Sequence, residues 1–260
     1  MRFAVLASGS SGNSTYVESG DARVLIDAGT NWKCLCARLR AAGAAPEALT
    51  AVLLTHDHQD HVSALSVLQH RHPVPVYATE GTAEAVCCAQ PEGADWAWNC
   101  FAAGSSFEVG PLSVEAFPVP HDAADPVGFV LSDGAVRLGV ATDLGDAPAV
   151  VAHHLAGCDA LSLEFNHDRL MLEGSGRPWS LIQRIRGRSG HLSNDQASEL
   201  LARIASPRLR RVVPAHLSAE CNRADLALAA ARDALRAAGA PGAALVEPRF
   251  PTPLFEVVPS

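Results

Sequence analysis

The sequence contains no run of about 18 uncharged apolar residues, which argues against a membrane-spanning helix. None of its 7 cysteines forms a C-x-x-C pair, so the cysteine spacing of a zinc ribbon is absent. Because that number is odd and the chain is long, a disulfide framework is not expected either. We expect most of the cysteines to be small core residues of a cytoplasmic protein.

The sequence also lacks a clear secretion signal and is almost without lysine. Its first apolar run, Phe3–Ala7, has the length of a strand and meets a Gly/Ser turn, so we expect a strand and not a signal peptide. Lys33 is the only lysine, so arginine carries nearly all of the positive charge. The planar guanidinium of arginine suits bidentate contacts with phosphate.

The composition is that of a folded protein with a large core. Of the 260 residues, 48% are hydrophobic and 18% are charged, and we expect one domain over residues 1–260. The net charge of -8 argues against a broad surface that coats nucleic acid. It does not exclude an anionic substrate, because bound divalent ions would add positive charge at the site itself.

Apolar runs and turn residues predict the order of the elements. The predicted strands are Phe3–Ala7, Thr15–Glu18, Ala22–Asp27, Ala51–Thr55, Val74–Ala78, Ser106–Val109, Leu112–Pro118, Val127–Ser132, Val136–Ala141, Ala160–Leu163 and Arg211–Val213, with one or two more within 243–258. The predicted helices are Asn31–Ala42, His61–His70, Glu80–Ala89, Ala147–Leu155, Trp179–Arg186, Asn194–Ile204 and Asp225–Ala238. Strands and helices alternate twice, which favours an α/β fold of two packed mixed sheets flanked by helices, an αββα sandwich.

A dense group of metal-binding residue types follows the predicted strand that ends at Thr55. His56, His58 and His61, together with Asp60, lie within one short loop. Alternate residues of such a loop can point into one cleft, so His56 and His58 can share one ion while Asp60 and His61 face a second. Imidazole and carboxylate suit zinc, with manganese or iron possible. A solvated polar turn would leave this density unexplained.

One loop cannot complete two metal sites, so other segments must supply ligands. His121, Asp143 and His216 each follow an apolar strand-like segment. In α/β proteins, loops at the ends of strands commonly hold site residues. Each of the three could instead be a turn or capping residue, but their common setting favours the metal site.

The pattern H-x-H-x-D-H, followed by a later histidine, an aspartate and a final histidine, resembles the metallo-β-lactamase superfamily over the whole chain. The resemblance implies that one ion is bound by His56, His58 and His121, and a second by Asp60, His61 and His216, with Asp143 bridging the two. Branches with an aspartate at the bridging position include phosphodiesterases, nucleases and thioester hydrolases. True β-lactamases usually carry a cysteine there, so lactam hydrolysis is disfavoured.

Three further segments resemble one branch, the YycJ/WalJ-like proteins, which are regarded as DNA exonucleases. These segments are 8–14, a Gly/Ser loop, 164–168, and 190–194. In the first, Ser10, Ser11 and Asn13 could hold a phosphate oxygen, although an ordinary hairpin turn is the alternative.

The other two segments contribute Asn166, His167, His191 and Ser193, which could line the substrate cleft or position the leaving group. Alternatively, Asp168 or Ser193 caps a helix, and the two histidines lie at the surface or behind the ligands.

Two remaining features bear on the substrate. Arg184, Arg186 and Arg188 cluster just before Gly190, which makes them candidates for contact with a phosphate backbone, although a solvated helical face is the alternative. Trp179 could stack on a base, but a core position is more common for tryptophan. No long substrate-binding arm is recognisable.

Charge favours a phosphodiester substrate over a neutral amide, because two dications outweigh Asp60, Asp143 and a hydroxide. We therefore expect a dinuclear metal-dependent phosphodiesterase, a DNA exonuclease, with a metal-bridging hydroxide as nucleophile. The residues expected to handle protons or the leaving group are Asp60, His191 and His167. A thioester hydrolase of the hydroxyacylglutathione type is an alternative, and so is a metal-bound regulatory protein without turnover. We expect a nucleic acid partner, with DNA favoured, and no membrane contact.

Overall fold

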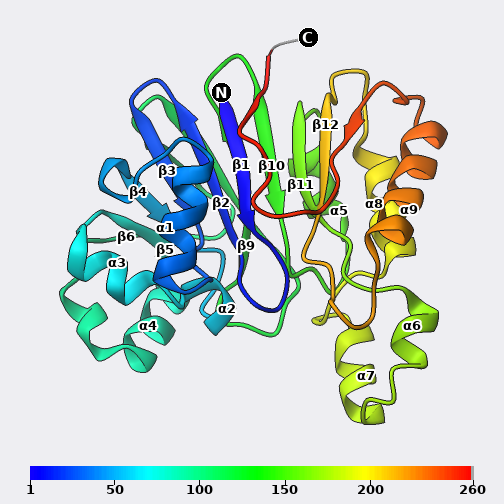
Figure 1. The fold of residues 1–260 in the computed structure, drawn as a ribbon, viewed down its shortest axis with the longest axis horizontal. Coiled ribbons are helices and arrows are strands. Elements are labelled where there is room, and N and C mark those ends of the chain that lie inside the picture. Colours follow the sequence, from blue (N-terminus) through cyan, green and yellow to red (C-terminus); the bar gives the residue numbers. More distant parts are fainter. Residues whose placement is uncertain (259–260) are drawn as a thin grey trace.

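The computed structural model describes residues 1–258, which form two seven-stranded sheets packed face to face with helices outside them (Figure 1). The αββα fold predicted from the sequence is confirmed. The first sheet has the order β14-β1-β2-β3-β4-β5-β6, and its strands are β1 (Arg2–Ala7), β2 (Ser14–Ser19), β3 (Ala22–Ile26), β4 (Ala51–Leu53), β5 (Val76–Thr79), β6 (Trp98–Phe101) and β14 (Phe255–Glu256).

The second sheet has the order β13-β12-β11-β10-β9-β8-β7. Its strands are β7 (Ser106–Val109), β8 (Leu112–Pro118), β9 (Val127–Ser132), β10 (Arg137–Ala141), β11 (Ala160–Glu164), β12 (Arg211–Ala215) and β13 (Ala244–Leu245). Strands β10, β11 and β12 are parallel neighbours, so their carboxyl ends meet at one edge of the sheet. Asp143, Glu164 and His216 lie at these three ends, which positions the site described below.

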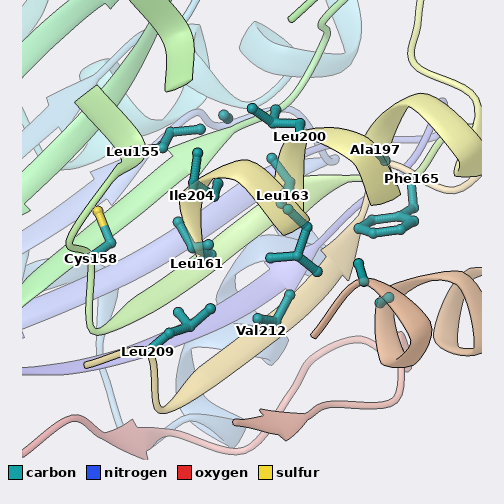
Figure 2. Close-up of a cluster of buried hydrophobic side chains, with 14 of the residues drawn as sticks. Leu155, Cys158, Leu161, Leu163, Phe165, Ala197, Leu200, Ile204, Leu209 and Val212 are labelled. Carbon is teal, nitrogen blue, oxygen red and sulfur yellow. The ribbon is translucent and has the colours of Figure 1, made fainter. Parts of the chain in front are cut away.

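Helices cover the outer face of each sheet (Figure 1). Those packed on the first sheet are α1 (Trp32–Ala41), α3 (Leu65–Arg71) and α4 (Glu80–Ala89), and those packed on the second are α5 (Ala149–Leu155), α8 (Asn194–Ile204) and α9 (Ala224–Ala237). Figure 2 shows Leu161 and Leu163 of β11 beneath Leu200 and Ile204 of α8. Because β11 is buried over its whole length, its position is fixed by apolar contacts, and the residue at its end is fixed with it.

A pair of short helices, α6 (Arg169–Glu173) and α7 (Trp179–Arg186), lies beside the sandwich (Figure 1). Leu172, Ile182 and Cys221 form a small apolar cluster beneath it, separate from the larger cores. Trp179 lies outside this cluster with 62% of its surface exposed, so the expectation of a core tryptophan is wrong.

Several expectations about elements need correction. The helix predicted over His61–His70 is two helices, α2 (Gln59–Val62) and α3, because the backbone hydrogen bond from the amide of Ala64 goes to Ala28 and not along a continuous helix. β6 and α6 were not predicted, since β6 is largely exposed and α6 is only 5 residues long. The cysteines are all free, but only three are buried, namely Cys36, Cys158 and Cys221. Within residues 1–258, no helix combines the length and apolar character that crossing a membrane requires. That residues 1–260 form one domain stays a prediction.

Candidate metal centre

The seven residues expected to bind metal all lie at one end of the sandwich, in loops that follow strands. The loop after β4 carries His56 and His58, helix α2 carries Asp60 and His61, and the ends of β8, β10 and β12 supply the other three. Asp143 and His216 have positive φ angles, 61° and 53°. A non-glycine residue in this region is strained by about 1–3 kcal/mol, and such strain commonly occurs at functional sites.

His56, His58 and His121 form a first group of ligands. Each offers a ring nitrogen, and these three atoms lie within 4.8 Å of one another. Nε2 of His121 is 3.3 Å from Nδ1 of His58. Three imidazoles that converge at this distance can hold one divalent ion, and the assignment of these three as its ligands, implied by the resemblance, stays a prediction.

Asp143 is the centre of a second group. Its Oδ2 lies 3.2 Å from Nε2 of His61 and 3.1 Å from Nδ1 of His216, while its Oδ1 is 3.7 Å from Nε2 of His121. Within residues 1–258, Oδ2 of Asp143, Nδ1 of His216 and Nε2 of His56 are buried and make no hydrogen bond of normal geometry. Buried polar atoms that converge without hydrogen bonds fit a bound cation. The position of Asp143 between both groups fits a shared ligand.

Asp60 is held differently from the other six. Its Oδ2 lies 3.7 Å from Nε2 of His61 and accepts a hydrogen bond of 3.1 Å from Nδ2 of Asn13. None of the three clusters of converging donor atoms found among residues 1–258 includes this carboxylate. Asp60 does line the cavity described below, so its role as a ligand stays a prediction.

His56 and His61 are oriented by buried groups behind them. Oδ2 of Asp27 lies 2.8 Å from Nδ1 of His61 and accepts a hydrogen bond of 2.8 Å from the hydroxyl of Thr55. The same hydroxyl lies 3.0 Å from Nδ1 of His56. Contacts of this kind fix which ring nitrogen faces a metal ion. Asp27 was not identified from the sequence, although it too ends a strand and has a positive φ of 60°.

Burial and neighbouring charges shift the pKa values of these side chains in different directions. Burial, aided by His61, lowers the pKa of His56 well below its usual value, so this imidazole stays neutral and can bind metal. Burial would also lower the pKa of His61, but the carboxylates of Asp27 and Asp143 outweigh it and hold that pKa well above its usual value. Although burial would raise the pKa of Asp143, His216 and His61 keep it well below the usual range, so the carboxylate is ionised.

Glu164, which is buried, and His191, which is partly exposed, form a pair beside Asp143. Oε1 of Glu164 lies 2.9 Å from Nδ1 of His191, and Oε2 of Glu164 accepts a hydrogen bond of 2.6 Å from the backbone N–H of Leu144. The carboxylate of Glu164 outweighs the effect of burial and raises the pKa of His191 to about 9. Sequence reasoning gave Glu164 no role, but a charged residue at the end of a buried apolar strand was the available signal.

A cavity of about 240 Å³ that opens to solvent lies at this site. His58, Asp60, His121, Asp143, His191 and His216 form one side of it, and α7 contributes another wall. A cavity of this size suits one small unit of a larger substrate.

The comparison with known proteins agrees with this geometry. Residues 22–217 match a family described as the beta-lactamase superfamily domain. The chain belongs to the metallo-β-lactamase superfamily. As a member of this superfamily it is a metal-dependent hydrolase.

Within the superfamily, the chain is similar to two curated exodeoxyribonucleases. It is 33% identical over 227 residues to the exodeoxyribonuclease YycJ of Bacillus anthracis, a match that covers 87% of this chain and 86% of that protein. It is also 33% identical over 228 residues to the exodeoxyribonuclease WalJ of Streptococcus pneumoniae serotype 2, with 87% and 85% covered. The resemblance to the YycJ/WalJ-like branch is therefore confirmed.

Solved structures of the metallo-β-lactamase superfamily share the fold. The metallo-β-lactamase fold protein YhfI of Bacillus subtilis superposes with a TM-score of 0.70 at 17% identity, covering 90% of this chain and 92% of that one. Zinc-bound PqqB of Methylobacterium extorquens superposes with a TM-score of 0.66 at 20% identity, covering 95% and 98%. At these identities the likeness concerns the fold alone.

In this superfamily member, only some of the residues expected to bind substrate reach the cavity. Ser10, Asn166 and Arg184 line it. Asn166 also donates a hydrogen bond of 3.0 Å to the backbone carbonyl of His216, so it positions a candidate ligand as well. Ser11 is exposed and lies outside the cavity lining.

The remaining four predicted substrate residues serve other contacts. Asn13 is buried and joins the Gly/Ser loop to Asp60. Ser193 is buried at the start of α8, where its side chain completes a capping box with Gln196, so the capping alternative is the one the structure has. Arg186 and Arg188 lie outside the lining and pair with acidic residues, Glu173 and Asp146.

His167, expected near the chemistry, is buried behind the cavity. Only 1% of its surface is exposed, and its Nδ1 makes no hydrogen bond within residues 1–258. Burial, together with His191 and Arg186, lowers its pKa to about 4. A direct role in catalysis would need a path to the substrate, which the cavity lining does not provide.

Proposed function

We propose that the protein is a dinuclear metal-dependent phosphodiesterase that removes nucleotides from the ends of DNA. The observation that carries the proposal is the position of Asp143, whose two carboxylate oxygens face His61 and His216 on one side and His121 on the other. The 33% identity to two exodeoxyribonucleases over most of both chains supports DNA as the substrate.

The proposed ligands are those expected from the sequence. His56, His58 and His121 would hold one divalent ion, and His61, His216 and Asp60 would hold the other, with Asp143 shared. Nitrogen and carboxylate donors in this proportion suit zinc, and also accept manganese or iron. Two such ions supply an acidified water and offset the charge that develops on the phosphate oxygens.

The chain itself supplies a proton donor at the cavity wall. Because Glu164 raises the pKa of His191 to about 9, this imidazole is protonated at neutral pH. His191 lines the cavity with 22% of its side chain exposed, and Nδ1 is engaged by Glu164, so Nε2 is the atom free to donate. We assign to His191 the protonation of the leaving oxygen, a contribution that typically increases rates by about 10²–10⁴-fold.

Turnover of two small substrates by the metal-loaded protein tests the reaction class. We expect hydrolysis of bis(p-nitrophenyl) phosphate and not of a glutathione thioester, because the two curated relatives at 33% identity are exodeoxyribonucleases. Asp143→Ala is expected to reduce the phosphodiesterase rate at least a thousandfold because it removes the shared ligand. The proposal fails if the thioester is the better substrate, or if Asp143→Ala retains both its metal and its rate.

A further inference from the structure

One wall of the cavity is formed by α7 and by Arg177, two residues before it. Leu181 and Ile185 are the only apolar side chains that line the cavity, as far as residues 1–258 are concerned, and Arg177 and Arg184 flank them. Residues three and four apart share a face of a helix, which explains why 181, 184 and 185 point the same way. Trp179, two residues from Leu181, is not part of the lining.

Both arginines are oriented by carboxylates on loops that carry candidate metal ligands. Nε of Arg184 donates a hydrogen bond of 2.6 Å to Oδ2 of Asp122, the neighbour of His121. Nη2 of Arg177 donates a hydrogen bond of 2.7 Å to Oε2 of Glu220, on the loop after β12. Within residues 1–258, the Nη atoms of Arg184 and the Nη1 and Nε atoms of Arg177 make no hydrogen bond, so each guanidinium keeps donors for another anion.

The wall is joined to the metal side of the cavity. The backbone N–H of His191 donates a hydrogen bond of 2.8 Å to the carbonyl of Ile185. A Cβ atom at Gly190 would lie 2.2 Å from that carbonyl oxygen, so only glycine permits this approach. The carbonyl of Gly190 in turn lies 3.1 Å from Nδ1 of His121. These contacts connect α7 to His121 through Ile185, Gly190 and His191.

We propose that this face of α7 is the subsite for the nucleotide next to the scissile phosphate. Leu181 and Ile185 pack against its sugar and base, and Arg177 and Arg184 bind the phosphate that follows. A nucleic acid chain presents this alternation of anionic and weakly polar groups, whereas a lone phosphodiester presents one anion only. The inference rests on the proposed function, because it assigns one nucleotide of the proposed DNA substrate to the α7 wall of the same cavity.

Salt dependence separates phosphate contacts from other effects. For single-stranded DNA, each phosphate contact contributes about 0.7 to the slope of log affinity against log salt. We measure kcat and KM for release of the terminal nucleotide from a single-stranded oligodeoxynucleotide by the metal-loaded protein, between about 50 and 200 mM salt. Arg177→Gln is expected to raise KM about tenfold and to reduce the slope by about 0.7, with Arg177→Lys restoring most of the slope.

Leu181→Asn is expected to raise KM about tenfold without changing the slope, since it removes apolar contact but no charge. The matched control is Arg236→Gln on α9, which removes the same charge from a residue paired with Asp233 outside the cavity. We expect its slope and KM to equal those of the wild type. Melting temperatures verify that each variant is folded.

The inference is overturned if Arg177→Gln has the same slope as Arg236→Gln, or if Arg177→Gln lowers kcat and leaves KM unchanged. A wild-type protein that hydrolyses bis(p-nitrophenyl) phosphate but no oligodeoxynucleotide overturns the DNA part of the proposed function, and this subsite with it. A wild-type protein that degrades the oligodeoxynucleotide, with variants that match the control, overturns the subsite alone.

Discussion

Oδ2 of Asp27 lies 2.8 Å from Nδ1 of His61, and both side chains are almost completely buried. The contact leaves Nε2 of His61 directed at Asp143, 3.2 Å away. A residue at the end of β3 thus determines which nitrogen of a candidate ligand faces the ion. Removing such an outer contact typically lowers metal affinity by about 10–100-fold.

Asp27→Ala is therefore expected to weaken metal binding by about 10–100-fold while the candidate ligands remain in place. Titration with a chelating competitor measures the affinity, and Asp233→Ala on the exposed face of α9 serves as the carboxylate control. Equal affinity in Asp27→Ala and the wild type would show that the contact does not orient His61.

Glu164→Gln distinguishes two roles for the Glu164–His191 pair. If His191 donates a proton, the loss of the carboxylate lowers its pKa, and kcat at neutral pH falls by at most the about 10²–10⁴-fold that a general acid supplies, while the metal content stays unchanged. The pH above which activity declines should also move to lower values, because less of the imidazole is protonated at neutral pH. Loss of one metal equivalent in Glu164→Gln would instead identify the pair as ligands, a role that the proximity of Glu164 and His191 to Asp143 and His216 also permits.

Gly29 permits the close approach of the loop that carries Asp60. A Cβ atom at this position would lie 1.6 Å from the backbone oxygen of Asp60 and 2.7 Å from the backbone nitrogen of Asn13. Gly29→Ala must displace backbone atoms, so we expect a loss of about 3 kcal/mol or more in the free energy of unfolding. Gly242→Ala is the control, since a Cβ there has nothing within 4 Å. Urea unfolding of both variants measures the difference, and equal stabilities would contradict the close contact.

His167 makes the stability of the fold depend on pH. Its pKa of about 4 in the folded protein lies below the ordinary value of 6.5, because burial disfavours the charged ring. Between pH 6.5 and pH 4 the unfolded chain takes up a proton on His167 that the folded chain does not. The stability that neutral His167 contributes to the folded state is therefore fully present above about pH 6.5 and is lost as the pH falls toward 4. The shift corresponds to a loss on the order of 3 kcal/mol.

His167→Phe is expected to remove that part of the pH dependence. We measure the free energy of unfolding of the metal-free wild type and of the metal-free variant at pH 7 and at pH 4. The loss of stability between the two pH values is then compared between the two proteins. If the wild type and His167→Phe lose the same stability over this range, His167 is not the buried titrating group.

Much of the metal centre could be predicted because its signal is local in the sequence. His56, His58 and His61 lie in one short loop, and their number there has no structural explanation. His121, Asp143 and His216 were predicted from their position after strands. For Asp143 and His216 that pattern is meaningful because β10, β11 and β12 are parallel neighbours whose ends meet at one edge, whereas β8, before His121, pairs antiparallel.

The parts that could not be predicted depend on contacts between distant segments. Glu164 meets His191 across 27 positions, and Asp27 meets His61 across 34, so nothing local reveals either pair. The roles of Arg184 and Arg186 likewise could not be separated from the sequence alone. Helical periodicity places Arg184 and Arg186 on different faces, but only the packing of α7 on Leu172 and Cys221 decides which face lines the cavity. Ser193 was ambiguous because a hydroxyl that caps a helix and one that binds phosphate look alike in sequence.

Digestion of linear and circular single-stranded DNA of the same sequence by the metal-loaded protein tests the account most directly. The account predicts that the linear strand is degraded to nucleotides from its end, that the circle persists, and that a chelator or Asp143→Ala stops the reaction. Failure of the metal-loaded wild type to degrade the linear strand, or equal degradation of the circle, would contradict it.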